Sequence, residues 1–258
     1  MNKKLLVLLN TFTLLLMLYA NFGSFAKIFS NETVASISYK YNTMFAPAGY
    51  AFSIWSIIFT FCIGFVVYQF HLLQTIDPNQ FILRTGIWFS IGNLSNALWV
   101  YCWTNEMLGY AVVLIFILLI SLVKLMLNYF SLNDNKNLKT RLLVWWPVTI
   151  YLGWIIVATV ACVAAWLVYL GCNVGKLTEE YLTIIMIFIG CGLYLILIRK
   201  YNLISTTLVG VWAFTAIAVR HWGKINSIAW VAITATILLI AAISINNFLS
   251  KKSKDYTD

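Results

Sequence analysis

The sequence predicts an all-α integral membrane protein with about eight transmembrane helices. The prediction rests on three observations: the composition, the number of long apolar runs and the placement of the charges. Of the 258 residues, 62% are hydrophobic and only 10% are charged, whereas soluble domains average about 45–50% apolar and about 25% charged residues. A chain of this composition belongs to the membrane class, and no soluble module is expected.

Eight apolar runs approach the length of about 20 residues that a helix needs to cross a bilayer. The seventh is short and rich in serine and threonine, and is the weakest of the eight. The first follows two lysines, as the core of a cleaved secretory signal would, but it exceeds the usual length of about 7–15 residues. We therefore expect a retained helix, with cleavage as the alternative. The runs cover residues 5–22, 49–70, 84–103, 108–130, 142–169, 181–198, 203–219 and 226–249.

Lysine and arginine are divided unevenly between the two sides of the expected topology. With the N-terminus inside, eleven of them fall on the cytoplasmic side and five on the other, while Lys124 lies near the inner end of the fourth run. The positive-inside rule then predicts a multi-pass protein with both termini cytoplasmic. The expected location is a bacterial plasma membrane. The net charge of +9 follows from this rule, so nucleic-acid binding is not expected.

The acidic residues argue against several classes of function. All eight fall in expected loops or tails, whereas ionisable groups inside the membrane mark proton relays and ion-coupled transport. Hydrolytic or metal chemistry needs a cluster of carboxylate, histidine or cysteine side chains, and the five cysteines show no C-x-x-C spacing. The sequence therefore predicts no catalytic residue and no metal site.

Aromatic residues are abundant, with 11 Trp, 14 Tyr and 17 Phe. Those near the ends of the runs fit interfacial belts, but Trp55, Trp99, Trp154 and Trp212 lie deeper. An indole N–H in hydrocarbon needs a partner, and the segment "NLSNALW" at 93–99 places two asparagines beside a deep tryptophan. This favours an aromatic pocket lining with polar tips, with ordinary helix packing as the alternative.

The start of the second run carries one motif. In "APAGYAFSIW", Pro47 lies eight residues before Trp55. Proline suits the first turn of a helix because its missing N–H would have no partner there. Gly49 gives the backbone the freedom for a tight turn. Pro47 and Gly49 are therefore predicted to shape the start of the second helix.

Two further runs carry related motifs. Asn96 and Trp99 are three residues apart in the third run, so they share a helix face. In the fifth run, "YLGWIIVATVACVAAW", Trp154 and Ala158 lie on one stripe of small residues. Small residues at this spacing allow close helix approach, which serves either a homodimer or a ligand beside the tryptophan.

Together these motifs resemble the tryptophan-rich sensory protein/translocator protein (TspO) family over about residues 1–170. "MLGYA" at 107–111 falls where the fourth helix of that family begins, with Tyr110 in place of a frequent tryptophan. Two features depart from the family: the first loop lacks tryptophan, and Cys162 replaces a frequent asparagine. Residues 171–258, with about three more helices, lie outside the five-helix core. The chain thus resembles an extended, divergent member.

The resemblance implies a five-helix ligand-binding bundle in residues 1–170, with the loop 23–48 as a lid, and additional helices in residues 171–258. It also implies a planar hydrophobic ligand, such as a porphyrin, haem or a sterol-like lipid, and no required cofactor. Mapped onto this sequence, the residues implied to line the cavity are Trp55, Asn96, Trp99, Tyr110, Trp154 and Ala158.

The first hypothesis is therefore a membrane receptor or sensory protein that binds such a ligand and is not an enzyme. An uncoupled transporter or exporter of the same ligand is the alternative, although the sequence shows no internal repeat of the kind common in transporters. A third hypothesis is an enzyme that modifies the bound lipid or porphyrin. The expected partners are the lipid bilayer and a small hydrophobic ligand, with a homodimer left open.

Overall fold

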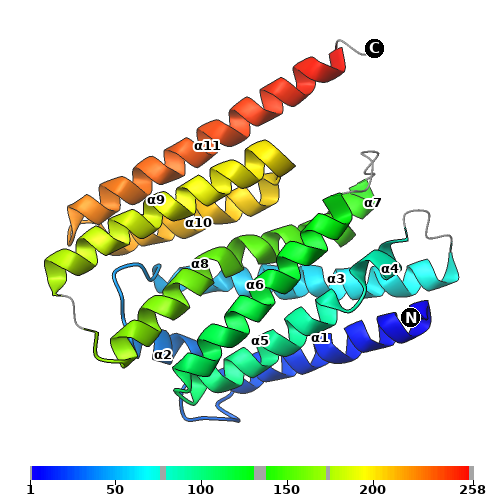
Figure 1. Ribbon diagram of the computed structural model, residues 1–258, viewed down its shortest axis with the longest axis horizontal. Coiled ribbons are helices and arrows are strands. Elements are labelled where there is room, and N and C mark those ends of the chain that lie inside the picture. The colour runs from blue at the N-terminus through cyan, green and yellow to red at the C-terminus, as the bar shows by residue number, and fades with distance from the viewer. Residues whose placement is uncertain (1, 76–79, 131–137, 173–174, 256–258) are drawn as a thin grey trace. The chain divides into compact units, whose positions relative to one another are not determined.

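The computed structural model describes residues 2–75, 80–130, 138–172 and 175–255, with side chains up to residue 249 (Figure 1). These residues form helices and no strand, which confirms the all-α prediction. All eight apolar runs are helical. The long helices are α1 (Lys3–Phe25), α3 (Ile54–Gln74), α5 (Trp88–Thr104), α6 (Leu108–Phe130), α8 (Trp146–Tyr169), α9 (Lys176–Tyr201), α10 (Ile204–His221) and α11 (Asn226–Asp255).

Short helical segments precede or join several of these. They are α2 (Val34–Lys40), a 3-10 turn (Gly49–Ser53), α4 (Phe81–Thr85), α7 (Leu138–Thr140) and a π turn (Arg141–Trp145). Within the described residues, seven helical stretches are long and apolar enough to cross a membrane. The expected eighth, α5, has 17 residues. It is short because Gly86, with a φ of 53°, ends α4 and separates it from α5.

The chain divides into two compact units. The N-terminal unit comprises residues 1–42 and 53–171, and the C-terminal unit comprises residues 43–52 and 172–258. The expected division after residue 170 differs from this one by a single residue. The sequence predicts a first domain that is continuous from residue 1 to residue 170. In the structure it is interrupted, because residues 43–52 pack with the C-terminal unit.

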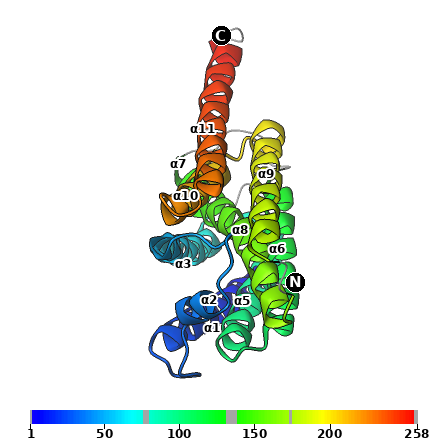
Figure 2. The same ribbon diagram turned by 90° about the vertical axis from the view of Figure 1, so that its left-hand side faces the viewer.

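The five long helices of the N-terminal unit form a closed ring. Around the ring the order is α1, α3, α8, α6 and α5, and α5 packs against α1 again (Figure 2). On α3, Trp55, Cys62 and Gln69 recur every seven residues, and Asn10 and Met17 do so on α1. A seven-residue spacing keeps side chains on one helix face, and the contacts described below place these faces inside the ring.

The C-terminal unit packs α9, α10 and α11 against one another. The helices meet closely at Gly210, where a Cβ atom would lie 2.7 Å from the Tyr194 ring and 3.0 Å from Leu239. Both neighbours are fully buried. The glycine therefore sets how near the three helices approach.

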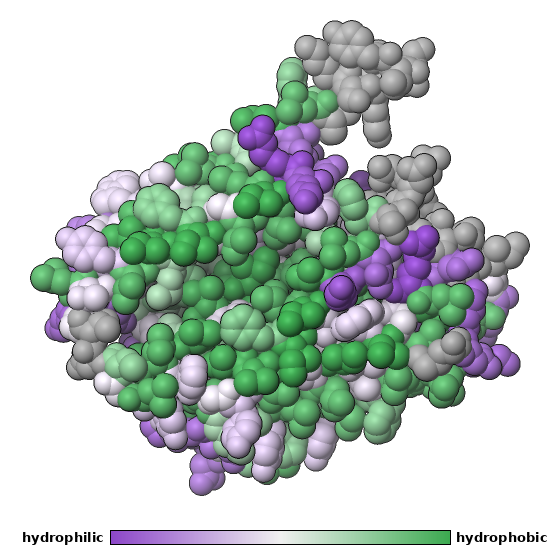
Figure 3. Space-filling model, viewed as in Figure 1, coloured by the Kyte–Doolittle hydropathy of each residue, from purple (hydrophilic) through white to green (hydrophobic). Residues whose placement is uncertain are grey.

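The outer surface is rich in large apolar side chains. Figure 3 shows hydrophobic residues over most of the visible face, and Phe12, Val67 and Ile189 are among the exposed ones on the long helices. Such a surface would be an aggregation hazard in water but suits lipid, where helices satisfy their own backbone groups. The protein is a multi-pass integral membrane protein.

Candidate functional site

Three polar side chains from three helices join inside the ring, near the N-terminus of α1. Ser90 Oγ donates to Asn10 Oδ1 at 2.6 Å, and Asn10 Nδ2 donates to Gln69 Oε1 at 2.9 Å. All three are buried. Buried amides are stable only when hydrogen-bonded, so this network fixes the register of α1 against α3 and α5.

A second polar group lies farther along α1. Asn21 Nδ2 donates to Asn96 Oδ1 at 2.8 Å. Tyr151 of α8 donates its hydroxyl to Met17 Sδ at 3.7 Å, and its phenol also lies close enough to Asn96 and Cys62 to interact with them. Asn96 therefore faces the middle of the ring, toward α8.

Aromatic rings from α3 and α8 adjoin this group. The indole of Trp55 meets that of Trp154 edge-on, with ring centroids 6.3 Å apart, and meets Tyr151 edge-on at 5.8 Å. Edge-to-face pairs at such distances are favourable. Since Tyr151 neighbours both Trp55 and Asn96, the structure brings Trp55, Trp154 and Asn96 into one cluster.

Trp99 extends the cluster along α5. Its indole stacks on Trp103 with centroids 5.3 Å apart, and it lies beside the thiol of Cys162 on α8. Ala158 is half-buried and lies one turn from Cys162 and one turn from Trp154 along α8. The sequence therefore places Ala158 between the Trp154 and Trp99 parts of the cluster.

Several buried polar atoms of this cluster make no hydrogen bond. They are Gln69 Nε2, both amide atoms of Asn93, Asn96 Nδ2 and Trp99 Nε1. Asn93, Asn96 and Trp99 are three residues apart in succession, so they line one face of α5. The arrangement offers hydrogen-bond donors beside aromatic walls, which is the composition of a ligand site.

Tyr110 is not part of the cluster, and the implied lining is wrong at this residue. Its side chain is 66% exposed, whereas the following Ala111 is fully buried. On α6 the inward positions continue from Ala111 through Ile115, Leu118 and Leu122. Tyr110 precedes this stripe by one residue and therefore points outward.

Five polar side chains of the cluster were missed by the sequence prediction: Asn10, Asn21, Gln69, Ser90 and Tyr151. A signal for three of them was present. Asn10, Asn21 and Gln69 are amides in or beside apolar runs, where a polar side chain faces the bundle interior by preference. Their partners could not be predicted, because each hydrogen bond joins residues more than 50 positions apart.

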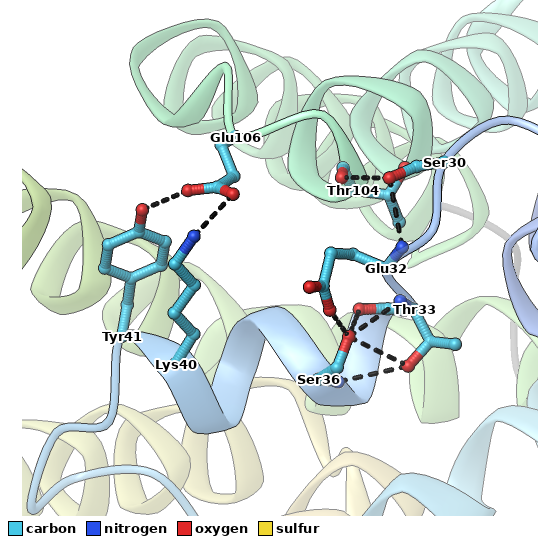
Figure 4. A network of polar contacts seen from close by, with 8 residues as sticks. All are labelled: Ser30, Glu32, Thr33, Ser36, Lys40, Tyr41, Thr104 and Glu106. Atoms are coloured by element: carbon cyan, nitrogen blue, oxygen red, sulfur yellow. Dashed lines mark hydrogen bonds and ion pairs between the residues drawn. The ribbon is translucent and has the colours of Figure 1, made fainter.

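Residues 26–42 of the first loop hold the end of α5 within the N-terminal unit (Figure 4). Ser30 Oγ donates to Thr104 O at 2.8 Å, and Trp103 Nε1 donates to Val34 O at 3.1 Å. Ile37 of α2 is fully buried. This half of the loop is a cover for the α5 end of the ring, and we call residues 26–42 the cover segment.

One ion pair closes the cover segment. Lys40 Nζ lies 2.6 Å from Glu106 Oε1, and Tyr41 donates its hydroxyl to the same carboxylate. The hydrogen bonds from Lys40 and Tyr41 lower the pKa of Glu106 below its usual value, and the Glu106 carboxylate raises the pKa of Lys40. The pair is partly exposed, so salt weakens it.

Pro47 and Gly49 are not part of the cover segment. They belong to residues 43–52, which pack with the C-terminal unit, where Ala48 N donates to Ala216 O at 3.1 Å. Gly49 begins the 3-10 turn that leads into α3. The expectation that the loop 23–48 forms a single lid is therefore wrong, because its last residues are held by α10.

Side chains of α9 and α10 bind the backbone of residues 43–52, which we call the anchored segment. Arg220 Nη1 donates to Ala46 O at 2.5 Å, and His221 Nε2 donates to Met44 O at 2.7 Å. Met44 N donates to Glu179 Oε1 at 2.8 Å. Trp212, which the sequence places deep in a run, also binds the anchored segment: its indole N–H donates to Ala51 O at 3.2 Å.

Within the described residues, no group of three or more histidine, cysteine or acidic side chains lies close enough to hold a metal ion. The buried polar side chains described in the N-terminal unit are asparagine, glutamine, serine and threonine. These groups bind by hydrogen bonds and do not carry charge. The cluster is thus a neutral donor set between aromatic rings.

Comparison with known families identifies the chain. The family model described as "TSPO-like protein" matches residues 7–245. No curated protein and no solved structure matches the chain. The match runs through both units, so α9, α10 and most of α11 lie within the matched region. The chain belongs to the TSPO-like protein family.

Proposed function

We propose that this protein is a membrane receptor or sensory protein that binds a planar hydrophobic ligand, of the tetrapyrrole or sterol-like class, inside the N-terminal ring. Membership of the TSPO-like family supports a ligand-binding or transport role in the membrane. The observation that carries the proposal is the meeting of Trp55, Trp154 and Asn96 around Tyr151. Indole faces and edges suit a flat ring, at about 0.5–1.5 kcal/mol per aromatic pair beyond area burial.

The same side chains favour binding over chemistry. A general acid or base needs a pKa near the working pH and a proton within reach, and amides and indoles do not titrate in that range. The cluster therefore fits a protein that recognises its ligand without converting it.

We also propose how the chain is oriented in the membrane. Both termini lie in the cytoplasm, as the lysine and arginine distribution favours, and the membrane is a bacterial plasma membrane. The cover segment then lies on the outer side, where Lys40 and Glu106 meet water. A cysteine introduced at Ser38 in a Cys172→Ser background, which removes the exposed native thiol, should react with a membrane-impermeant maleimide in intact cells. Labelling only after lysis would contradict this topology.

Fluorescence tests the ligand proposal. Protoporphyrin IX titrated into the purified protein should quench tryptophan emission saturably. Trp154→Ala and Asn96→Ala should each weaken the affinity about tenfold, because each removes a contact of about 1–1.5 kcal/mol. Trp230→Phe is the control, since Trp230 is an exposed tryptophan of the C-terminal unit. Non-saturating quenching, equal in all variants, would contradict the proposed site.

A second candidate function is uncoupled transport of the same ligand. It is favoured by the length of the polar cluster, which extends from Asn10 near one end of α1 to Trp99 near the far end of α5. Protoporphyrin should then cross proteoliposomes at zero membrane potential, and Asn96→Ala should slow it. Saturable binding without flux would leave the receptor as the function.

A further inference from the structure

The hydrogen-bond donors without partners are concentrated on one face of α5. Asn93, Asn96 and Trp99 follow one another at three-residue intervals, and none of their buried side-chain N–H groups makes a hydrogen bond of good geometry. Asn96 lies near the Tyr151 phenol and Trp99 near the Cys162 thiol. Six residues of helix rise about 9 Å, so the three donors form a short row. We call these three residues the donor row.

A fourth donor lies near the start of the row. Gln69 Nε2 is buried without a partner, and Gln69 is linked through Asn10 to Ser90, which lies one turn before Asn93 on α5. Among the side chains that the structure describes, the one buried acceptor without a hydrogen bond is Asn93 Oδ1. The interior therefore calls for a group that mainly accepts hydrogen bonds.

Packing alone does not account for the row. Native proteins leave few buried polar groups without partners, because each forfeits its hydration. Another amide of the same ring is fully bonded: both ends of the Asn10 amide have partners, although Asn10 and Asn93 are similarly buried, at 0% and 1% exposure. The contrast between two buried asparagines of one bundle singles out Asn93.

The surroundings also decide the charge of the group that fits. Within the described part of the N-terminal unit, no lysine, arginine or histidine is buried. A carboxylate placed at the row would lack a counter-ion in a medium where isolated charges are very unfavourable. A neutral carbonyl oxygen can accept several N–H groups without that cost.

We propose that the donor row binds a neutral carbonyl oxygen, carried by an ester, ketone or lactam, at one edge of the ligand. This inference rests on the proposed function and specifies which ligands the site prefers. The aromatic rings of Trp55 and Trp154 contact the flat part of the ligand, and the α5 amides receive its oxygen. Asn93 is the specificity-determining residue.

The first test needs no ligand. Asn93→Leu replaces an unbonded amide by an apolar side chain of similar size, so it should raise the melting temperature of the ligand-free protein. Asn10→Leu is the matched control. It should lower the melting temperature, because Ser90 and Gln69 lose their hydrogen bonds to Asn10. If Asn93→Leu lowers the melting temperature as Asn10→Leu does, the Asn93 amide is already satisfied, by protein or by water, and the inference is overturned.

The second test compares two probes, protoporphyrin IX and its neutral dimethyl ester, in the same detergent. The ester should bind the wild type more tightly than the free acid. Asn93→Leu, and Trp99→Phe as a milder variant that keeps a ring, should weaken ester binding about tenfold and about fivefold. Tighter binding of the acid, or ester binding unchanged in both variants, would overturn the inference.

The two proposals fail separately. If neither porphyrin binds the wild type, the tetrapyrrole proposal fails, while the melting temperatures still decide whether the row is built to receive a ligand. If both porphyrins bind but the acid is preferred, the proposed function survives and the preference for a neutral carbonyl does not.

Discussion

In the N-terminal unit, buried amide side chains hydrogen-bond from helix to helix, as in the chain Ser90, Asn10, Gln69, while a buried threonine such as Thr159 bonds within its own helix. In the C-terminal unit, a buried threonine such as Thr207 bonds to the carbonyl of its own helix turn, Leu203 O at 3.0 Å. Among the described residues, every buried side-chain nitrogen or oxygen without a hydrogen bond belongs to the N-terminal unit. The two interiors therefore differ in whether buried donors are left without a protein partner.

Gly210 of α10 and Gly92 of α5 differ in the room that they leave for a side chain, although Gly23 at the end of α1 is also tight, since a Cβ there would overlap the Phe29 ring. Gly210 lets Tyr194 and Leu239 pack directly against the backbone of α10. In the N-terminal unit, a Cβ at Gly92 of α5 would meet Leu118 and Ser121 at ordinary contact distances of 3.4 and 3.6 Å. At Gly210 of the C-terminal unit, by contrast, an added Cβ would overlap buried neighbours.

The largest expected effect tests this packing. Gly210→Val should destabilise the C-terminal unit by about 3 kcal/mol, because the added methyl groups overlap the buried Tyr194 ring. Unfolding in a denaturing detergent, followed by proteolysis within α9 to α11, measures it.

The control for this substitution is Gly192→Ala on α9, where a Cβ would meet nothing within 4 Å. It should be neutral or stabilise slightly, because alanine favours helix over glycine. Equal losses for the two glycines would show that helix propensity, and not close packing, sets the C-terminal stability.

The next effect compares a hydroxyl in each interior. Ser90→Ala should cost about 1–3 kcal/mol, because it leaves Asn10 Oδ1 buried without its donor. Thr207→Val should cost less than about 1 kcal/mol, because Leu203 O also accepts from the Thr207 backbone N–H. The unfolding midpoints of both variants measure these costs. If Thr207→Val destabilises the protein as much as Ser90→Ala, the two interiors do not differ in how they use buried hydroxyl groups.

A smaller effect tests the division of the first loop. Glu179→Ala removes the acceptor of Met44 N, so hydrogen exchange in the anchored segment should rise about tenfold, the factor for about 1.4 kcal/mol. Exchange in the cover segment should not change. Glu180→Ala is the matched control, since Glu180 accepts from Ser227 instead. A rise in both halves of the loop would show that they move together.

The smallest effect concerns pH. Lys40 and Tyr41 lower the pKa of Glu106 below its ordinary 4.5, so this pairing stabilises the protein above that pH and is lost as pH falls through the lowered pKa. Lys40, whose pKa is raised, contributes below its ordinary value and loses its effect in strong alkali. Wild type and Glu106→Gln should therefore differ in melting temperature at pH 7 and converge near pH 3. A difference independent of pH would contradict this role for Glu106.

The helices and part of the cluster could be predicted from the sequence for clear reasons. Hydropathy sets the length of an apolar run, so all eight runs were located. Spacing along one helix puts Asn96 and Trp99 on one face whatever the fold. The motifs also carried Trp55 and Trp154, which the structure brings into contact.

The remainder depended on tertiary structure. The family resemblance implies that Tyr110 faces inward. A shift of one residue turns a helical side chain by about 100°, and Ala111 faces inward instead. Two of the unpredicted contacts join distant parts of the chain: the hydrogen bond of Asn10 to Gln69, and that of Arg220 to Ala46 in the anchored segment. Periodicity within one helix carries no information on such contacts.

The most direct test of the central claim is a density map of the protein with bound protoporphyrin IX dimethyl ester. The account predicts a flat density inside the N-terminal ring, between Trp99 and Trp154, with an ester carbonyl within hydrogen-bonding distance of Asn93 or Asn96. A map in which side chains close this volume, and the porphyrin lies among α9, α10 and α11 or on the lipid-facing surface, would contradict it.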